Sequence, residues 1–173
     1  MLYVLSQISV VLSCLIYGAS FFVRKKHLLL LCNIANNFFF GLQYLLLFQL
    51  SSALSIFLAI AFFIITYYLE KHNKSKFTPL VSIMGVILLI VISVLFWNGP
   101  LSLLPTIATS FVFIGTIFAQ TLEIKLFYLV STFLNVTFMF IIHSYFGVAC
   151  NIVIIITAII GIIKEISQRK KKV

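Results

Sequence analysis

Seven long apolar runs divide this chain, and each is close to the length that crosses a lipid bilayer. An α-helix needs about 20 residues to cross a hydrocarbon core of about 30 Å. The expected spans are 2–23, 27–48, 50–69, 78–97, 101–120, 124–143 and 145–163. Strands of a membrane barrel would be shorter and would alternate polar with apolar residues, which these runs do not. The sequence therefore predicts an all-α membrane protein with seven transmembrane helices.

Composition agrees with this class. Hydrophobic residues make up 63% of the chain and charged residues 9%, whereas a soluble domain carries about 25% charged residues. Seven spans use nearly all of the 173 residues, so we expect no soluble catalytic domain. The first run follows neither a basic segment nor a small-residue cleavage site, and we expect it to remain as a helix.

The positive charges predict how the chain is oriented in the membrane. The 12 basic residues lie in or beside alternate links between the spans, or in the tail. They are Arg24, Lys25, Lys26, Lys71, Lys74, Lys76, Lys125 by the fifth link, Lys164, Arg169, Lys170, Lys171 and Lys172. Because cytoplasmic loops collect Lys and Arg, we expect the N-terminus outside and the C-terminus inside. The net charge of +9 then indicates contact with anionic lipid headgroups rather than with nucleic acid.

An internal repeat is indicated by residues about 97 positions apart. An offset of 97 pairs Gly18 with Gly115, and an offset of 98 pairs Asn37 with Asn135. We therefore expect two parallel three-helix repeats joined by a linker helix, related by an axis along the membrane normal. The expected parts are a first bundle at 1–77, a linker helix at 78–97, a second bundle at 98–163 and a basic cytoplasmic tail at 164–173.

Three segments carry a resemblance to a known family. They are LSQISVVLSCLIYGASFF near the start, LLPTIATSFVFIGTIF in the middle and FGVACNIVIIITAIIGIIK near the end. Together they resemble the YgjV family of bacterial inner-membrane proteins across nearly the whole chain. The resemblance implies a multi-pass protein of the bacterial cytoplasmic membrane and says little about mechanism.

The expected arrangement of three, one and three helices also looks like the SWEET, PQ-loop and PnuC-type transporters. Leu104 and Pro105 resemble the start of a PQ-loop repeat, and Gln7 lies near the start of the first, although a full PQ dipeptide is absent. This second resemblance is an analogy of architecture. It implies a transporter of a small metabolite such as a sugar, a nucleoside or a vitamin.

Amide side chains mark one face of the second span. At 100° per residue, Asn33, Asn36, Asn37 and Gln43 fall within about a third of the helix circumference. An amide left without a partner in hydrocarbon costs about 4 to 8 kcal/mol, so these groups must face protein, water or a ligand. The candidate substrate-binding residues are Asn37, Asn135 and Asn151, with Asn33, Asn36 and Gln120 lining the path.

Two functions remain open at this point. In the first, the amides bind a small neutral polar solute in a facilitative transporter, because the spans lack the carboxylates that ion-coupled transporters usually need. In the second, amides and hydroxyls only bond helix to helix, each bond contributing about 0.6 to 2 kcal/mol. The protein is then a membrane scaffold or accessory subunit. A homo-oligomer is open in either case.

We expect no enzyme, no cofactor and no metal. Cys14, Cys32 and Cys150 fall in apolar runs without metal-ligand spacing and are typical of small packing residues. Glu70 and Glu165 are expected at the cytoplasmic ends of spans among the basic residues, together with Glu123. The sequence therefore gives no paired carboxylates and no nucleophile with its base inside the membrane.

Overall fold

The chain folds into a bundle of helices. A computed structural model describes residues 2–97, 99–100, 103–118 and 120–170. In that part of the chain the helices are α1 (Leu2–Ser20), α2 (Lys26–Leu46), α3 (Leu50–Lys71), a short 3-10 turn η1 (Ser75–Phe77), α4 (Thr78–Leu95), α5 (Leu103–Ile117), α6 (Thr121–Ile141) and α7 (Tyr145–Lys170). The predicted all-α class is confirmed.

Six of the described helices are long and apolar enough to cross a membrane. The seventh, α5, is apolar but shorter than its expected span of 101–120. At about 1.5 Å per residue it is roughly 22 Å long. The first two positions of that expected span, 101 and 102, and position 119 lie outside the described residues. The last helix, by contrast, runs past its expected end at 163 to Lys170, so the basic tail begins as helix.

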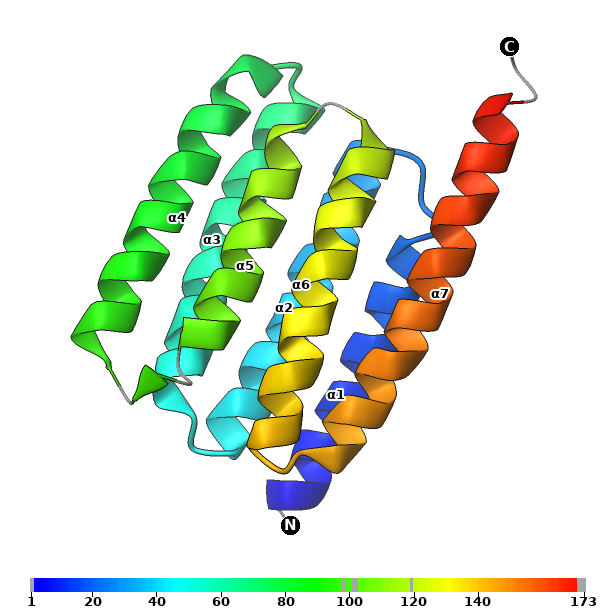
Figure 1. Cartoon of the computed structure of the whole chain (residues 1–173). Coiled ribbons are helices and arrows are strands. Elements are labelled where there is room, and N and C mark those ends of the chain that lie inside the picture. The colour runs from blue at the N-terminus through cyan, green and yellow to red at the C-terminus, as the bar shows by residue number, and fades with distance from the viewer. Residues whose placement is uncertain (1, 98, 101–102, 119, 171–173) are drawn as a thin grey trace.

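The helices form two layers that pack face to face (Figure 1). One layer holds α1, α2 and α3, and the other holds α5, α6 and α7, with α4 at one edge. Packing of α7 on α1 closes one side, and packing of α3 on α5 closes the other. The middle helices of the two layers, α2 and α6, face each other across the interior.

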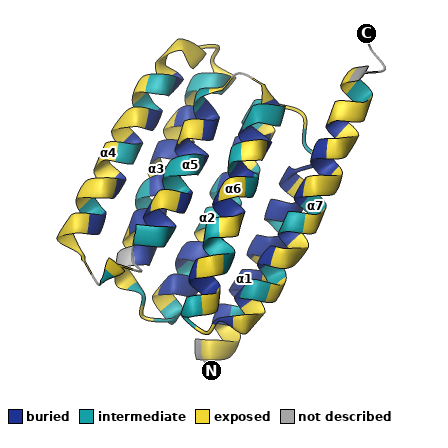
Figure 2. Ribbon diagram, viewed as in Figure 1, coloured by how far each residue is buried: buried dark blue, intermediate teal, exposed yellow. Residues whose placement is uncertain are grey.

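Exposed residues lie on the outer faces of the helices and buried ones face the interior (Figure 2). The exposed residues include many large apolar side chains, and the buried ones include many hydroxyl and amide side chains. On α4 the exposed side chains include Leu80, Ile83 and Ile87, which suits contact with lipid better than with water. Its buried Ser82 bonds the hydroxyl of Thr116 on α5 at 2.8 Å. Hydroxyl bonds of this kind hold transmembrane helices together, and they attach α4 to the rest of the bundle.

Basic residues gather at one end of the bundle. The links 21–25 and 72–77, the end of α5 and the start of α6 lie at this end together with the C-terminal end of α7 (Figure 1). We call it the basic end. The opposite end carries the links 47–49 and 142–144 and the start of α1.

The links at 47–49 and 142–144 form the same type of turn. In each, a backbone amide bonds a carbonyl five residues earlier, from Gln49 N to Tyr44 O and from Ser144 N to Met139 O, both at 2.9 Å. The residue before that amide has a left-handed backbone, with φ of 58° at Phe48 and 56° at His143. A left-handed residue after the last turn is a common way to end a helix. These two turns lie 95 positions apart, and a turn of the same type ends α3, where Lys74 N bonds Leu69 O at 2.8 Å and Asn73 has a φ of 56°.

Two glycines let α1 and α7 approach closely, and they give a matched test of this contact. A Cβ atom added at Gly161 would lie 2.7 Å from the backbone oxygen of Phe21, whereas one at Gly18 would lie 3.3 Å from Thr157 Oγ1. We expect Gly161→Ala to lower the free energy of unfolding by about 1–3 kcal/mol, because a backbone atom must shift. Gly18→Ala should be near neutral.

The measurement is denaturant unfolding of the purified variants in detergent micelles. Alanine has the higher helix propensity, so any loss at Gly161 reports packing rather than a weaker helix. Equal stability of the two variants would contradict the close approach of α7 to the end of α1.

Candidate functional site

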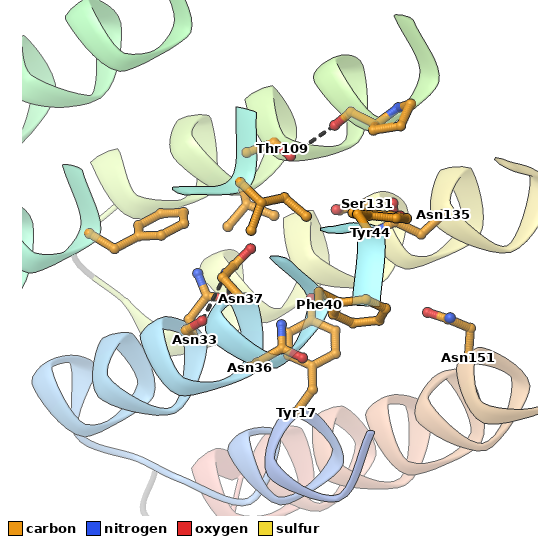
Figure 3. Close-up of a pocket in the computed structure, with 14 residues that line it drawn as sticks. Tyr17, Asn33, Asn36, Asn37, Phe40, Tyr44, Thr109, Ser131, Asn135 and Asn151 are labelled. Atoms are coloured by element: carbon orange, nitrogen blue, oxygen red, sulfur yellow. Dashed lines mark hydrogen bonds between the residues drawn. The ribbon is translucent and has the colours of Figure 1, made fainter. Parts of the chain in front are cut away.

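A cavity of about 40 Å³ lies between the two layers and is lined from six of the seven helices (Figure 3). Among the described residues, α4 contributes nothing to its wall. Its polar wall is formed by Tyr17, Asn33, Asn36, Asn37, Tyr44, Thr109, Ser131, Asn135 and Asn151. On this measure a water molecule needs about 10–15 Å³, so the cavity has room for roughly three.

Five of the six predicted site residues meet at this cavity. Asn33, Asn36 and Asn37 come from the middle of α2, Asn135 comes from α6, and Asn151 comes from α7 (Figure 3). The first and last of them, Asn33 and Asn151, are more than 100 positions apart in the chain. The fold thus brings together amides from both layers.

The sixth, Gln120, is not part of the cavity wall. It directly precedes α6 at the basic end, where its side-chain oxygen Oε1 accepts a hydrogen bond from the guanidinium of Arg169. The structure therefore separates Gln120 from the amides with which it was grouped.

Some of the amides are held in place by their neighbours. Asn36 is buried, and its Oδ1 accepts a hydrogen bond of 2.6 Å from Ser13 Oγ on α1. Asn37 Nδ2 donates to the backbone oxygen of Asn33 at 2.8 Å and to its Oδ1 at 3.0 Å. These bonds fix the direction of the α2 amides, so the face that they present to the cavity is well defined.

Other polar atoms around the cavity remain open. Asn33 Nδ2 is buried and has no hydrogen-bond partner within the described part of the chain. Asn151 uses its Nδ2 to bond Gly147 O on its own helix at 2.8 Å, which leaves Oδ1 as an acceptor. Buried polar groups are rarely left unsatisfied. An open donor beside a cavity large enough for water therefore points to water or a polar solute there.

Apolar clusters border the cavity on both sides. Toward the basic end, Tyr17, Phe63 and Val112 belong to a buried cluster that continues to Phe21 and Ile124. Toward the opposite end, the lining residues Phe40, Tyr44 and Ile56 belong to a second cluster that includes Phe138 and Met139. The amides thus form a polar layer between two apolar ones.

Aromatic rings form part of each cluster. On the side away from the basic end, the ring of Tyr44 lies 6.3 Å from that of Phe40 and 6.0 Å from that of Phe138, measured between centroids. On the other side, the ring of Tyr17 lies 5.8 Å from that of Tyr128, whose backbone oxygen accepts the Tyr17 hydroxyl at 3.3 Å. These contacts place packed aromatic rings beside the cavity in both directions.

Sequence reasoning did not select Phe40 and Tyr44. Both follow Asn33, Asn36 and Asn37 at the spacing of three and four residues that keeps side chains on one helix face. This spacing could have indicated that Phe40 and Tyr44 lie on the same face of the helix as the amides. In a chain with 19 phenylalanines, an aromatic residue at such a position does not stand out from the lipid-facing ones.

A buried ion pair also lies outside the predicted site. Lys125 is 1% exposed, and its Nζ lies 2.6 Å from Glu165 Oε2. Both residues lie at the basic end with the other charges, as the sequence predicts. Their burial and pairing were not predicted, because they depend on the packing of α7 against the start of α6. Glu70 pairs with Lys26 at 2.7 Å in a more accessible place. Among the described residues, no group of three His, Cys, Asp or Glu side chains could hold a metal ion.

Comparison with protein families identifies a family of bacterial membrane proteins. The model of the family Imp-YgjV, described as bacterial inner membrane protein, matches residues 4–169. The chain belongs to this family. The resemblance to YgjV is thereby confirmed, and the Imp-YgjV family together with the apolar helices makes this a multi-pass protein of the bacterial inner membrane. No curated protein matches the chain, and no solved structure does.

Proposed function

We propose that this Imp-YgjV protein is a facilitative transporter of a small neutral polar metabolite. The proposal rests chiefly on the cavity, in which amides from α2, α6 and α7 meet between two apolar clusters. Repeat-built transporters hold their substrate in such a place, near the middle of the membrane. Solute enters when one cluster parts and leaves when the other does.

The chemistry of the wall favours an uncharged solute. None of the described lining residues carries a formal charge, and the polar ones offer amide and hydroxyl groups that both donate and accept. A charged solute would be desolvated there without a counter-charge, which costs several kcal/mol. A hydroxyl- or amide-bearing solute such as a sugar, a nucleoside or a vitamin fits this wall better.

The size of the cavity indicates that the bundle is closed. Ligand sites for drug-sized molecules are about 300–1,000 Å³, much larger than the 40 Å³ found between α2 and α6. A solute larger than a few atoms needs the two layers to move apart. Contacts of α1 with α7 and of α3 with α5 would then act as the edges about which the layers rock.

The rocking units in this proposal are two three-helix repeats, α1–α3 and α5–α7, with α4 as the linker. Two features support them. The first is the identical turn at 47–49 and 142–144. The second is a glutamate near the end of the third helix that bonds the first residue of the second helix. Lys26 Nζ lies 2.7 Å from Glu70, and Thr121 Oγ1 lies 2.8 Å from Glu165.

Both features give an offset of 95 for the second and third helices, rather than the 98 expected from the sequence. The new offset pairs Asn36 with Ser131 and Asn37 with Thr132. Asn135 then lies about one turn beyond the position equivalent to Asn37. The amides would therefore form an asymmetric site, with α2 supplying most of the polar groups.

The same proposal includes an orientation. The basic end faces the cytoplasm, since Lys and Arg collect on that side of bacterial membranes. The N-terminus then lies outside and the C-terminus inside. The cluster with Tyr44 and Phe138 closes the cavity toward the outside, and the cluster with Tyr17 and Tyr128 closes it toward the cytoplasm.

One observation favours the alternative, a membrane scaffold or accessory subunit. Asn36 and Asn151 already bond within the bundle, to Ser13 and to Gly147, as they would if their only role were to hold helices together. In a scaffold the remaining open atoms bind water, and the cavity never opens.

A binding screen separates the two functions. The purified protein in detergent is heated with neutral solutes that range from glycerol to sugars, nucleosides and vitamins, and its melting temperature is recorded. The variants are Asn135→Ala and Asn151→Ala, and the control is Thr137→Ala, an exposed residue two positions from Asn135 on the same helix. We expect one solute class to stabilise the wild type and the control, and to lose most of this effect in the two cavity variants.

The scaffold gives a different pattern. No solute then raises the melting temperature of the wild type, and each cavity substitution lowers the melting temperature by itself through a lost helix contact. A solute that stabilises wild type, control and cavity variants alike would place its binding outside the cavity and contradict the proposed site.

A further inference from the structure

A groove at the basic end lies between the α1–α2 link and the last turns of α7. It has a volume of about 220 Å³ and is lined by Arg24, Thr121, Glu165, Gln168 and Arg169. A smaller hollow of about 60 Å³ shares three of these residues and is also lined by Lys125 and Lys164. The groove is separate from the amide cavity, with which it shares no lining residue.

Positive charge is in excess in this groove. Its walls and those of the adjoining hollow carry four cations, from Arg24, Lys125, Lys164 and Arg169, and a single carboxylate, from Glu165. Both oxygens of this carboxylate already have partners. Its Oε2 pairs with Lys125 at 2.6 Å, and its Oε1 accepts from Thr121 at 2.8 Å and from Arg169 at 2.9 Å.

Arg24 is bonded to a neutral atom, and Arg169 divides its bonds between a neutral atom and the carboxylate of Glu165. Arg24 donates to the side-chain oxygen of Gln168, and Arg169 donates through its other nitrogen to that of Gln120. An amide oxygen accepts a hydrogen bond but does not balance a charge. Both arginines are exposed beside the groove, while the buried Lys125 lines the adjoining hollow.

We propose that this groove binds a phosphate group. A guanidinium presents parallel N–H donors that match phosphate oxygens and bind them more strongly than neutral acceptors. Phosphate would displace the amide oxygens of Gln168 and Gln120 from Arg24 and Arg169. Basic pockets between transmembrane helices at the cytoplasmic side bind lipid headgroups, and the groove lies at the ends of α6 and α7, at that depth.

The test uses the full chain in detergent and follows its melting temperature as ligand is added. The ligands are phosphatidylglycerol, the zwitterionic phosphatidylcholine and inorganic phosphate. The double variant Arg24→Gln with Arg169→Gln removes the two guanidinium groups. Its matched control, Lys74→Gln with Lys76→Gln, makes the same charge change at the same end, in the α3–α4 link. If the first pair folds poorly, Arg24→Lys with Arg169→Lys keeps the charge and removes the bidentate geometry.

We expect phosphatidylglycerol to stabilise the wild type and the lysine control more than phosphatidylcholine does. In the arginine variant its apparent affinity should fall by about 30-fold, because two charge-assisted guanidinium–phosphate contacts are lost. The lysine control makes no such contact and should keep the affinity of the wild type. If the phosphate group belongs to a lipid, this result is obtained and inorganic phosphate has no effect on the melting temperature. A soluble phosphate source gives a shift with inorganic phosphate that the arginine variant also loses.

Two results would overturn the site. One is the absence of stabilisation by any phosphate-bearing ligand. The other is an equal loss in the arginine variant and in the lysine control, which would mean that anionic lipid is attracted by the overall charge of the basic end and not by the groove. Neither result bears on the amide cavity, which the screen of neutral solutes tests independently.

Discussion

Replacing Glu165 by methionine should lower the free energy of unfolding by about 3–5 kcal/mol, the usual cost of leaving one member of a buried ion pair without its partner. Lys125 is 1% exposed and lies 2.6 Å from this carboxylate. Without it, the ammonium group has no counter-charge among the described residues that line the hollow. Arg169 also loses its contact but lies close to solvent and can turn outward.

The structure offers a matched control in Glu70. Its carboxylate pairs with Lys26 at 2.7 Å, and each of the two side chains is 13% exposed. Lys26 therefore reaches water more readily, and Glu70→Met should cost only about 1 kcal/mol. Denaturant unfolding of both variants in micelles gives the comparison.

A double variant tests the cause of the loss. Lys125→Met combined with Glu165→Met removes both buried charges and leaves two apolar side chains of similar length. Such replacements are often neutral or stabilising, so we expect the double variant to recover most of the stability lost in Glu165→Met. If Glu165→Met and Glu70→Met cost the same, or if the double variant is the least stable, Lys125 is not buried in the way described.

The second large effect concerns transport. We expect Ser131→Leu to reduce solute flux to the level of liposomes that contain no protein. Ser131 is 2% exposed and lines the amide cavity from α6. Leucine is larger than serine by about two non-hydrogen atoms, and it stands here beside a cavity of only about 40 Å³. It would fill the space between α2 and α6 with apolar groups and leave the amides of α2 without a solute.

The control for this variant is Thr137→Leu on the exposed face of the same helix. Overpacking at Ser131 should cost about 1–3 kcal/mol of stability, so melting temperature is recorded beside flux. Flux is measured in liposomes loaded with the neutral solutes of the binding screen. Full flux in Ser131→Leu would show that the solute does not pass this cavity.

The helices and much of the cavity could be predicted from the sequence for the same physical reason. In a bilayer an amide must face inward, so the spacing of Asn33, Asn36 and Asn37 indicates which side of α2 is buried. The same argument identified Asn135 and Asn151, and all five line one cavity. Backbone hydrogen bonding within the membrane allows only helices or closed barrels, which is why the fold class followed from apolar run lengths.

What the sequence did not show depends on contacts between distant segments. Lys125 and Glu165 are 40 positions apart, and each looked like a charge that marks the end of a span. Only the packing of α7 on α6 shows that they pair. Gln120 was grouped with the amides because it ends an expected span, but it lies before α6 beside Arg169.

The offset between the two proposed repeats is difficult to predict from the sequence for a different reason. Offsets of 95 and 98 residues differ by nearly one helical turn and match apolar residues almost equally well in a chain that is 63% hydrophobic. The choice between them comes from the turns at Phe48 and His143, which share a left-handed backbone but no residue type. Backbone geometry of this kind leaves little trace in the sequence.

The central claim is that the amide cavity opens to water, and cysteine accessibility at Asn135 tests it most directly. The native Cys14, Cys32 and Cys150 are first replaced by alanine, and Asn135→Cys is compared with Thr137→Cys on the exposed face of α6. A thiol-specific reagent that cannot cross membranes reacts with the thiolate, which forms in water and not in lipid. It is applied to intact cells and to inverted vesicles.

A transporter predicts that the Asn135→Cys variant is modified from both sides of the membrane and is protected by the solute that stabilises the protein, whereas the Thr137→Cys variant is not modified. Modification of Asn135→Cys from neither side, with the chain folded and inserted, would contradict the account and leave the amides with a purely structural role.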